Sequence, residues 1–127
     1  MADVVVVYTT WPDAEKAEAA GAEAVAERLA ACANLHAPIR SIYRWEGALE
    51  RTAEIAMTLK TTDEAAPALV ALLLQRHPDE VPCILGWRTE AALSHAGYLD
   101  WVTGETTPGP DEAMQTLSDE PISSGEV

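Results

Sequence analysis

The chain has 127 residues, 48% of them hydrophobic, which is typical of one globular domain with a single core. Its 21 aspartates and glutamates outnumber its 8 lysines and arginines, and the formal net charge of −13 disfavours binding to the phosphates of nucleic acids. The sequence has no run of about 18 apolar residues, which excludes a membrane-spanning helix, so we expect no membrane partner.

The N-terminal part of the chain predicts a strand followed by a helix. Residues 4–8 are an apolar, mostly β-branched run without alternation, which is typical of a strand buried on both faces. Asp13 is a favourable helix N-cap, and apolar residues recur near the helical period from Ala14 to about Ala31. The predicted helix therefore has a narrow face of small side chains, continued by Cys32, that fits closely against a sheet.

The next segment predicts an antiparallel hairpin. Residues 33–45 are rich in strand-forming side chains, and the Glu-Gly pair at 46–47 predicts a tight reversal. Residues 49–61 alternate between apolar and polar side chains, as expected of a strand with one buried face.

The following segment predicts a second helix, a strand and a short helix. Leucines at helical spacing after Pro67 predict a helix, and the His77-Pro78 pair ends it because a residue before proline disfavours helical dihedrals. Residues 81–87 then predict a strand, and residues 91–102 predict a weak helix.

This order of elements predicts an α+β, ferredoxin-like split βαβ sandwich with an antiparallel sheet, over residues 1–102. Right-handed crossovers place both main helices on one face of the sheet, so the other face is bare in a monomer and an oligomer is expected. Residues 103–127 carry six acids, no base and repeated prolines and glycines. We expect an acidic flexible tail there that contributes little to the fold.

Four short motifs are more specific than the fold. They are RLAACAN at 28–34, SIYRWEG at 41–47, the Lys-Thr pair at 60–61 and YLDW at 98–101. In this order they resemble the CutA family of divalent-cation tolerance proteins, and the resemblance covers residues 3–102. It implies a homotrimer with a role in the tolerance of divalent metals, copper above all.

One block departs from the family pattern. The family usually reads HPYExPEI, whereas residues 77–84 read HPDEVPCI, so Asp79 replaces an aromatic residue and Cys83 replaces an acid. The resemblance also implies a pocket between subunits that binds metal ions or a small ligand. The candidate residues for this inter-subunit pocket are Tyr43, Trp45, Glu54 and Lys60.

Each of these pocket candidates also has a simpler interpretation. Tyr43 and Trp45 are aromatic residues of a kind that more often packs in a core or an interface. Glu54 and Lys60 are six residues apart, about 20 Å along a strand, and so cannot pair within one chain. A solvated charged face accounts equally well for these two residues.

The candidate metal ligands are Cys32, His77 and Cys83. Thiolates prefer soft ions such as copper and zinc, and Cys83 follows His77 at a distance of six residues. This spacing matches no established metal motif, and a free cysteine commonly packs as a small apolar residue. The sequence leaves open whether the cysteines bind a metal ion or pack as apolar residues. The only candidate cofactor is a divalent or soft metal ion, such as copper or zinc. Two cysteines are too few for a disulfide framework, so we expect a cytoplasmic protein.

The sequence shows no nucleophile–base pair, phosphate loop or cofactor fingerprint, so we expect no enzyme. The leading hypothesis is a trimeric, non-enzymatic divalent-cation tolerance protein that binds metal ions weakly. The alternatives are a PII-like trimeric small-ligand sensor and a structural scaffold. A sensor of that class would need a long loop and a basic cleft, whereas the hairpin turns tightly at residues 46–47 and the chain is acidic.

Overall fold

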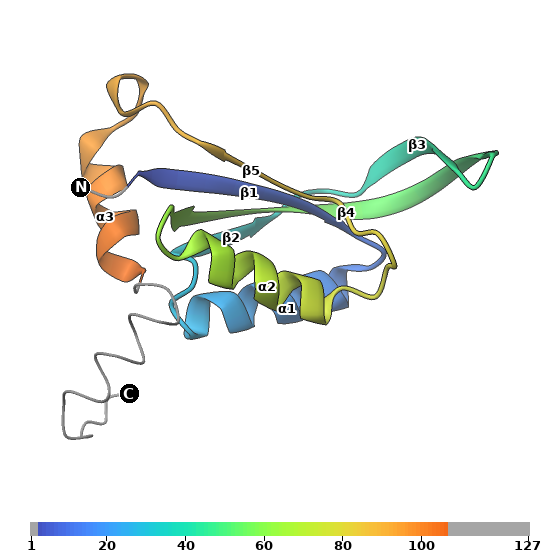
Figure 1. The fold of residues 1–127 in the computed structure, drawn as a ribbon, viewed down its shortest axis with the longest axis horizontal. Helices are drawn as coiled ribbons and strands as arrows, with labels where there is room; N and C mark the ends of the chain where they lie inside the picture. Colours follow the sequence, from blue (N-terminus) through green and yellow to red (C-terminus); the bar gives the residue numbers. More distant parts are fainter. Residues whose placement is uncertain (1–2, 107–127) are drawn as a thin grey trace.

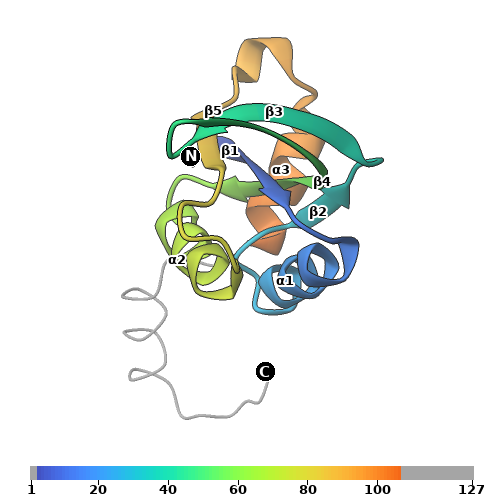
Figure 2. The same ribbon diagram turned by 90° about the vertical axis from the view of Figure 1, so that its right-hand side faces the viewer.

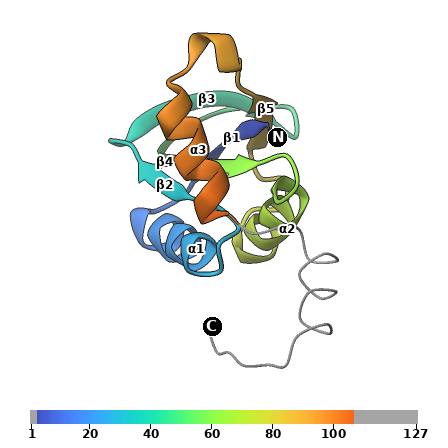
Figure 3. The same ribbon diagram turned by 90° about the vertical axis from the view of Figure 1, so that its left-hand side faces the viewer.

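The computed structural model describes residues 3–106, which form one antiparallel sheet and three helices (Figure 1). The elements in chain order are β1 (Val4–Trp11), α1 (Ala14–Ala26), β2 (Cys32–Leu35), β3 (Ile39–Trp45), β4 (Ala48–Thr62), α2 (Ala66–Arg76), β5 (Ile84–Arg88), a 3₁₀ turn (Ala91–Leu93) and α3 (Ala96–Glu105). Helices α1 and α2 lie side by side on one face of the sheet (Figure 2), and α3 crosses one end of it (Figure 3). None of these helices is long and apolar enough to span a membrane.

The sheet has the strand order β2-β4-β1-β5, with every pairing antiparallel. The long strand β4 pairs with β3 through residues 48–54 and with β2 through residues 57–60. The hairpin of β3 and residues 48–54, called the arm below, therefore extends beyond the rest of the sheet (Figure 1). The ferredoxin-like prediction is confirmed, and β2 is the additional strand.

The core lies between the sheet and the two helices. Alternation along β4 turns Met57 and Leu59 towards the helices, and both are fully buried there. Helix α1 contributes small residues to this contact. Its buried positions are Ala17, Ala20, Gly21 and Ala24. The predicted face of small side chains against the sheet is therefore confirmed at Ala17 and Gly21, whereas Val25, which the helical period also placed on this face, is exposed.

We expect Gly21→Ala to destabilise the protein. A Cβ atom at Gly21 would lie 2.8 Å from Met57 Sδ and 3.0 Å from Ala33 Cβ, so the core would have to shift. Overpacking costs about 1–3 kcal/mol, which exceeds the helix propensity of about 1 kcal/mol that alanine gains over glycine. Chemical denaturation measures the change. Gly104→Ala is the matched control, because no atom lies within 4 Å of its new Cβ and only the propensity gain is expected.

Helix α1 ends at Ala26, five residues before the predicted end. Arg28 adopts a positive φ of 61°, and the Leu29 N–H donates to the Ala24 carbonyl oxygen, as in a Schellman C-cap. Glycine usually occupies this cap position, so the sequence contained no recognisable stop signal. Cys32 consequently begins strand β2 and does not lie on the apolar face of the helix, which corrects the prediction.

Three other boundaries differ from the sequence prediction. The extended segment 33–45 is two strands, since β2 ends at Leu35 and β3 begins at Ile39. Strand β5 begins at Ile84, after the two prolines. Helix α3 continues to Glu105, past the predicted domain boundary, and Arg28 donates to the Gly104 carbonyl oxygen at 2.9 Å. The rest of the predicted tail, residues 107–127, lies outside the described residues.

Candidate functional site

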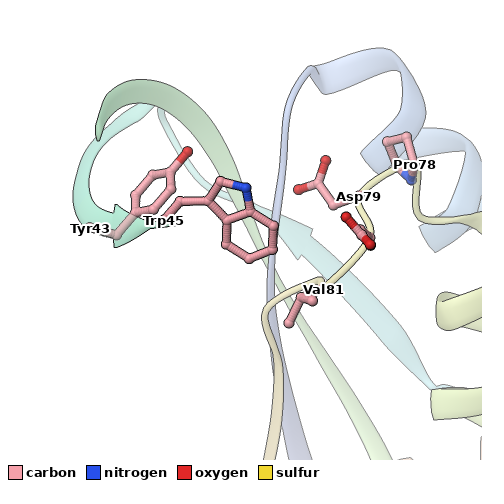
Figure 4. A pocket seen from close by; sticks show the side chains of 6 residues that line it. Tyr43, Trp45, Pro78, Asp79 and Val81 are labelled. Carbon is pink, nitrogen blue, oxygen red and sulfur yellow. The ribbon is translucent and has the colours of Figure 1, made fainter. Parts of the chain in front are cut away.

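The candidate site is a hollow between the arm and the segment that joins α2 to β5 (Figure 4). It consists of two adjoining cavities of about 370 and 410 Å³, which share Tyr43, Asp79 and Val81 in their walls. The floor includes Tyr8 and Thr10 of β1, which alternation places on the face of the sheet opposite α1 and α2. We call this feature the arm hollow.

Strand pairing fixes the wall that the arm contributes. The Ser41 hydroxyl donates to the Glu54 carboxylate at 2.5 Å, which orients this acid across the hairpin. Tyr43 and Trp45 follow on the same face of β3, and both side chains are about 40% exposed. Figure 4 shows the Trp45 indole extending from the arm towards the opposite wall. The aromatic wall is therefore open to solvent or to a neighbouring molecule.

The opposite wall is the segment from Pro78 to Cys83. The His77 side chain is fully buried and stacks on Trp11 with a centroid distance of 4.2 Å. At the other end of the segment, the Cys83 carbonyl oxygen accepts a hydrogen bond from the Thr10 N–H at 3.4 Å. Both ends of this wall are thereby attached to the sheet.

The lining of the arm hollow is acidic. Glu54, Asp79 and Glu80 contribute carboxyl groups, and the described residues that line it include no lysine or arginine. The Cys83 thiol lies in the same lining. Carboxylates and thiolates are both ligands of divalent cations, with opposite preferences for hard and soft ions. The arrangement is therefore suited to attracting cations.

The three predicted metal ligands do not form one centre. Cys32 pairs with Lys60, whereas Cys83 lies beside Thr10 on the far side of β1. The two cysteines are separated by about four residues along the strands and three strand spacings across the sheet, about 13 Å and 14 Å.

His77 is not available as the third ligand in this conformation. Its Nε2 lies 2.7 Å from the Thr10 carbonyl oxygen, and its Nδ1 lies 3.1 Å from the Asp79 backbone nitrogen. Both ring nitrogens are thus engaged in hydrogen bonds. Within residues 3–106, no group of three or more histidines, cysteines or acids is positioned to hold a metal ion.

The predicted pocket residues divide between two places. Tyr43, Trp45 and Glu54 line the arm hollow, but Lys60 lies near the other end of β4, where its Nζ donates to Asn34 Oδ1 at 2.6 Å. The separation of Glu54 and Lys60 along one strand is confirmed.

The second place also contains Cys32. Its Sγ lies 3.4 Å from the Tyr98 hydroxyl. This hydrogen bond and partial burial raise the pKa of Tyr98 to about 12, so the phenol stays neutral at physiological pH.

Sequence reasoning missed Ser41, Thr10 and Glu80 as lining residues. The apolar run of β1 has no alternation that would assign Thr10 to a face. The sequence does contain a signal for Ser41, because a hydroxyl that lies across a hairpin from a carboxylate can donate a hydrogen bond to it. Asp79 was distinguished only as a departure from a family pattern, and Cys83 also as a candidate metal ligand; the structure places both in the lining.

Comparison with known proteins identifies the family. Residues 5–105 match the model of the CutA1 divalent ion tolerance protein family. The chain is 38% identical over 103 residues to the divalent-cation tolerance protein CutA of Pyrococcus horikoshii, covering 81% of this chain and 98% of that protein. It is 43% identical over 102 residues to CutA of Salmonella newport, covering 79% and 85% of the two chains.

Solved structures agree with these sequence matches. The divalent cation tolerance protein of Thermus thermophilus superposes with a TM-score of 0.77 at 36% identity, covering 82% of this chain and 99% of that one. CutA1 of Ehrlichia chaffeensis gives a TM-score of 0.78 at 28% identity, covering 84% and 98%. The motifs, the element order and these matches together show that the chain belongs to the CutA1 family of divalent ion tolerance proteins.

Proposed function

We propose that this chain is a non-enzymatic, homotrimeric protein that contributes to divalent-cation tolerance by binding cations weakly in the arm hollow. The observation that carries the proposal is that Glu54, Asp79 and Cys83 line the same open hollow, although within the described part of one subunit these three residues do not form a complete ligand set. A carboxylate pair supplies the oxygen ligands that divalent cations accept, and the thiol adds a preference for zinc and copper.

Weak binding follows from the number of ligands. Tight structural metal sites use four protein ligands with closed geometry. The arm hollow brings fewer together in one subunit and is open on its aromatic side. A neighbouring subunit adds ligands or excludes water in the trimer that we propose. Large exposed apolar residues on the arm and on β5, such as Ile42 and Leu85, support such an assembly.

A non-enzymatic role is supported by the chemistry of the lining. Ser41 is a hydroxyl in the hollow, but its hydrogen-bond partner is the Glu54 carboxylate. The nearby imidazole of His77 is buried with both nitrogens engaged, so it is not placed to act as a base. We also propose a cytoplasmic location, because Cys32 and Cys83 are free thiols, as is usual in a reducing compartment.

Calorimetry with zinc, reduced copper and magnesium tests the binding site. We expect the parent protein to bind zinc with a Kd of about 10–100 µM, which corresponds to about 5.5–7 kcal/mol. Asp79→Asn should weaken the binding of every cation tested. Cys83→Ser should weaken zinc and copper binding by about tenfold and leave magnesium unchanged, because a thiolate prefers soft ions. Zinc affinity should also rise with pH, since the thiol must lose its proton to bind.

Cys32→Ser is the matched control, because its thiol lies outside the arm hollow. It should bind all three cations as the parent does. Equal zinc affinity in the parent and Cys83→Ser would remove Cys83 from the site. A loss confined to Cys32→Ser would move the site to strand β2.

A further inference from the structure

The two hydrogen bonds of His77 specify one tautomer. The Thr10 carbonyl oxygen can only accept, so Nε2 carries the proton and donates at 2.7 Å. The Asp79 backbone N–H can only donate, so Nδ1 is unprotonated and accepts at 3.1 Å. The ring is therefore neutral, with a donor and an acceptor both in use. With its side chain fully buried against Trp11, the ring faces the core and not the hollow.

The bond from the Asp79 N–H to Nδ1 spans two residues along the chain. It has the form of an Asx turn, in which a side-chain acceptor binds the backbone N–H two positions later and fixes the direction of the chain. Here it fixes the residue whose carboxylate lines the arm hollow (Figure 4). The carboxylate itself lies 4.0 Å from Nδ1, beyond hydrogen-bond distance, and so is left free for the hollow.

We propose that His77 is a positioning residue for the arm hollow and not one of its ligands. It ties the Asp79 backbone to the Trp11–Thr10 end of β1, and thereby holds the Asp79 carboxylate opposite Glu54. The effect on cation binding rests on the function proposed above. The effect on the Asp79 backbone does not, because it concerns a hydrogen bond within the chain.

Two substitutions separate the two bonds of the ring. His77→Asn places an amide oxygen where Nδ1 accepts, so the turn to the Asp79 N–H is retained. His77→Gln places an amide nitrogen where Nε2 donates to the Thr10 carbonyl oxygen, and leaves the Asp79 N–H without its acceptor. Both variants lose the stacked ring on Trp11, so the loss of packing is common to the pair.

The measurements are amide hydrogen exchange at Asp79 and zinc calorimetry on the full chain. We expect slow exchange at Asp79 in the parent and His77→Asn, and fast exchange in His77→Gln. Zinc affinity should stay within about twofold of the parent in His77→Asn and fall by about fivefold in His77→Gln, the factor that loss of one ordinary hydrogen bond gives. The ring nitrogen chemical shifts of the parent should show the Nε2-protonated tautomer and stay unchanged on addition of zinc.

Each result bears on one of the two proposals. Equal exchange at Asp79 in both variants would overturn the positioning role. A zinc-dependent shift of the ring nitrogens, with binding lost in both variants, would make His77 a ligand and overturn it as well. If the parent binds no cation, the proposed function fails, but the exchange of the Asp79 N–H still decides the role of His77.

Discussion

Replacing Trp11 by alanine is expected to cost about 3–5 kcal/mol of folding free energy, a large share of the roughly 5–15 kcal/mol that holds a typical domain together. Trp11 is the largest of the fully buried side chains. Its Nε1 donates to Thr9 Oγ1 at 2.7 Å, and that hydroxyl donates in turn to the Met57 carbonyl oxygen at 2.9 Å. The ring also supports His77, so the substitution leaves a cavity and loosens the wall of the arm hollow.

Guanidinium denaturation at fixed protein concentration measures this loss, because the stability of an oligomer depends on concentration. Trp11→Phe keeps an aromatic ring but removes the bond to Thr9, so an intermediate loss of about 1–2 kcal/mol is expected. Leu93→Ala is the control for removing a large apolar side chain. Leu93 is 84% exposed, and its truncation should stay within about 0.5 kcal/mol. A loss below about 1 kcal/mol in Trp11→Ala would contradict the central place of this ring.

The local signals of the sequence were sufficient for most of the fold. Alternation in β4 correctly predicted which side chains enter the core, and the His77-Pro78 pair correctly marked the end of α2. The reversal at Glu46 and Gly47 is confirmed by positive φ values of 50° and 82°, the conformation that a two-residue hairpin turn requires. Each of these features is determined by residues that are close together in the sequence, so a local sequence pattern is enough to predict it.

The boundaries that failed depend on tertiary contacts. Arg28 takes a left-handed conformation without glycine, and the Ala31 N–H donates to the Lys60 carbonyl oxygen as the chain joins β4. No periodicity in residues 14–35 shows that a distant strand ends the helix there. The same pairing converted Cys32 from a predicted helical residue into a strand residue.

The site was predictable only in part, for a related reason. The family resemblance put Tyr43, Trp45, Glu54 and Lys60 in one pocket, and spacing along the strand showed only that Glu54 and Lys60 are far apart. The structure leaves the first three in the arm hollow and places Lys60 elsewhere. The position of Asp79 opposite this group is set by the antiparallel pairing of β1 with β5 and by the length of the arm. Neither the pairing of β1 with β5 nor the length of the arm can be read from the spacing of residues 77–84.

We expect one face of the arm to form the contact between the subunits of the proposed trimer. Residues directly opposite each other in a hairpin share a face, so Ile42 lies with Arg51, and Arg44 lies with Leu49. All four are exposed. This face joins apolar side chains to cations in a chain whose net charge is −13, so the acidic surface of a second copy complements it.

We therefore expect the parent chain to have three times the 13.6 kDa mass of one chain in light scattering coupled to gel filtration at micromolar concentration. Ile42→Asp should convert the trimer to monomers, because it places a charge in the centre of an apolar contact and adds repulsion between acidic copies. High salt should weaken the parent trimer partially, since it screens the arginines but not the apolar contact.

Leu74→Asp is the matched control. Leu74 is 52% exposed on helix α2, away from the arm, and this variant should remain trimeric. A parent that is monomeric at this concentration would remove the trimer from the proposed function, and a trimeric Ile42→Asp would move the interface away from this face of the arm.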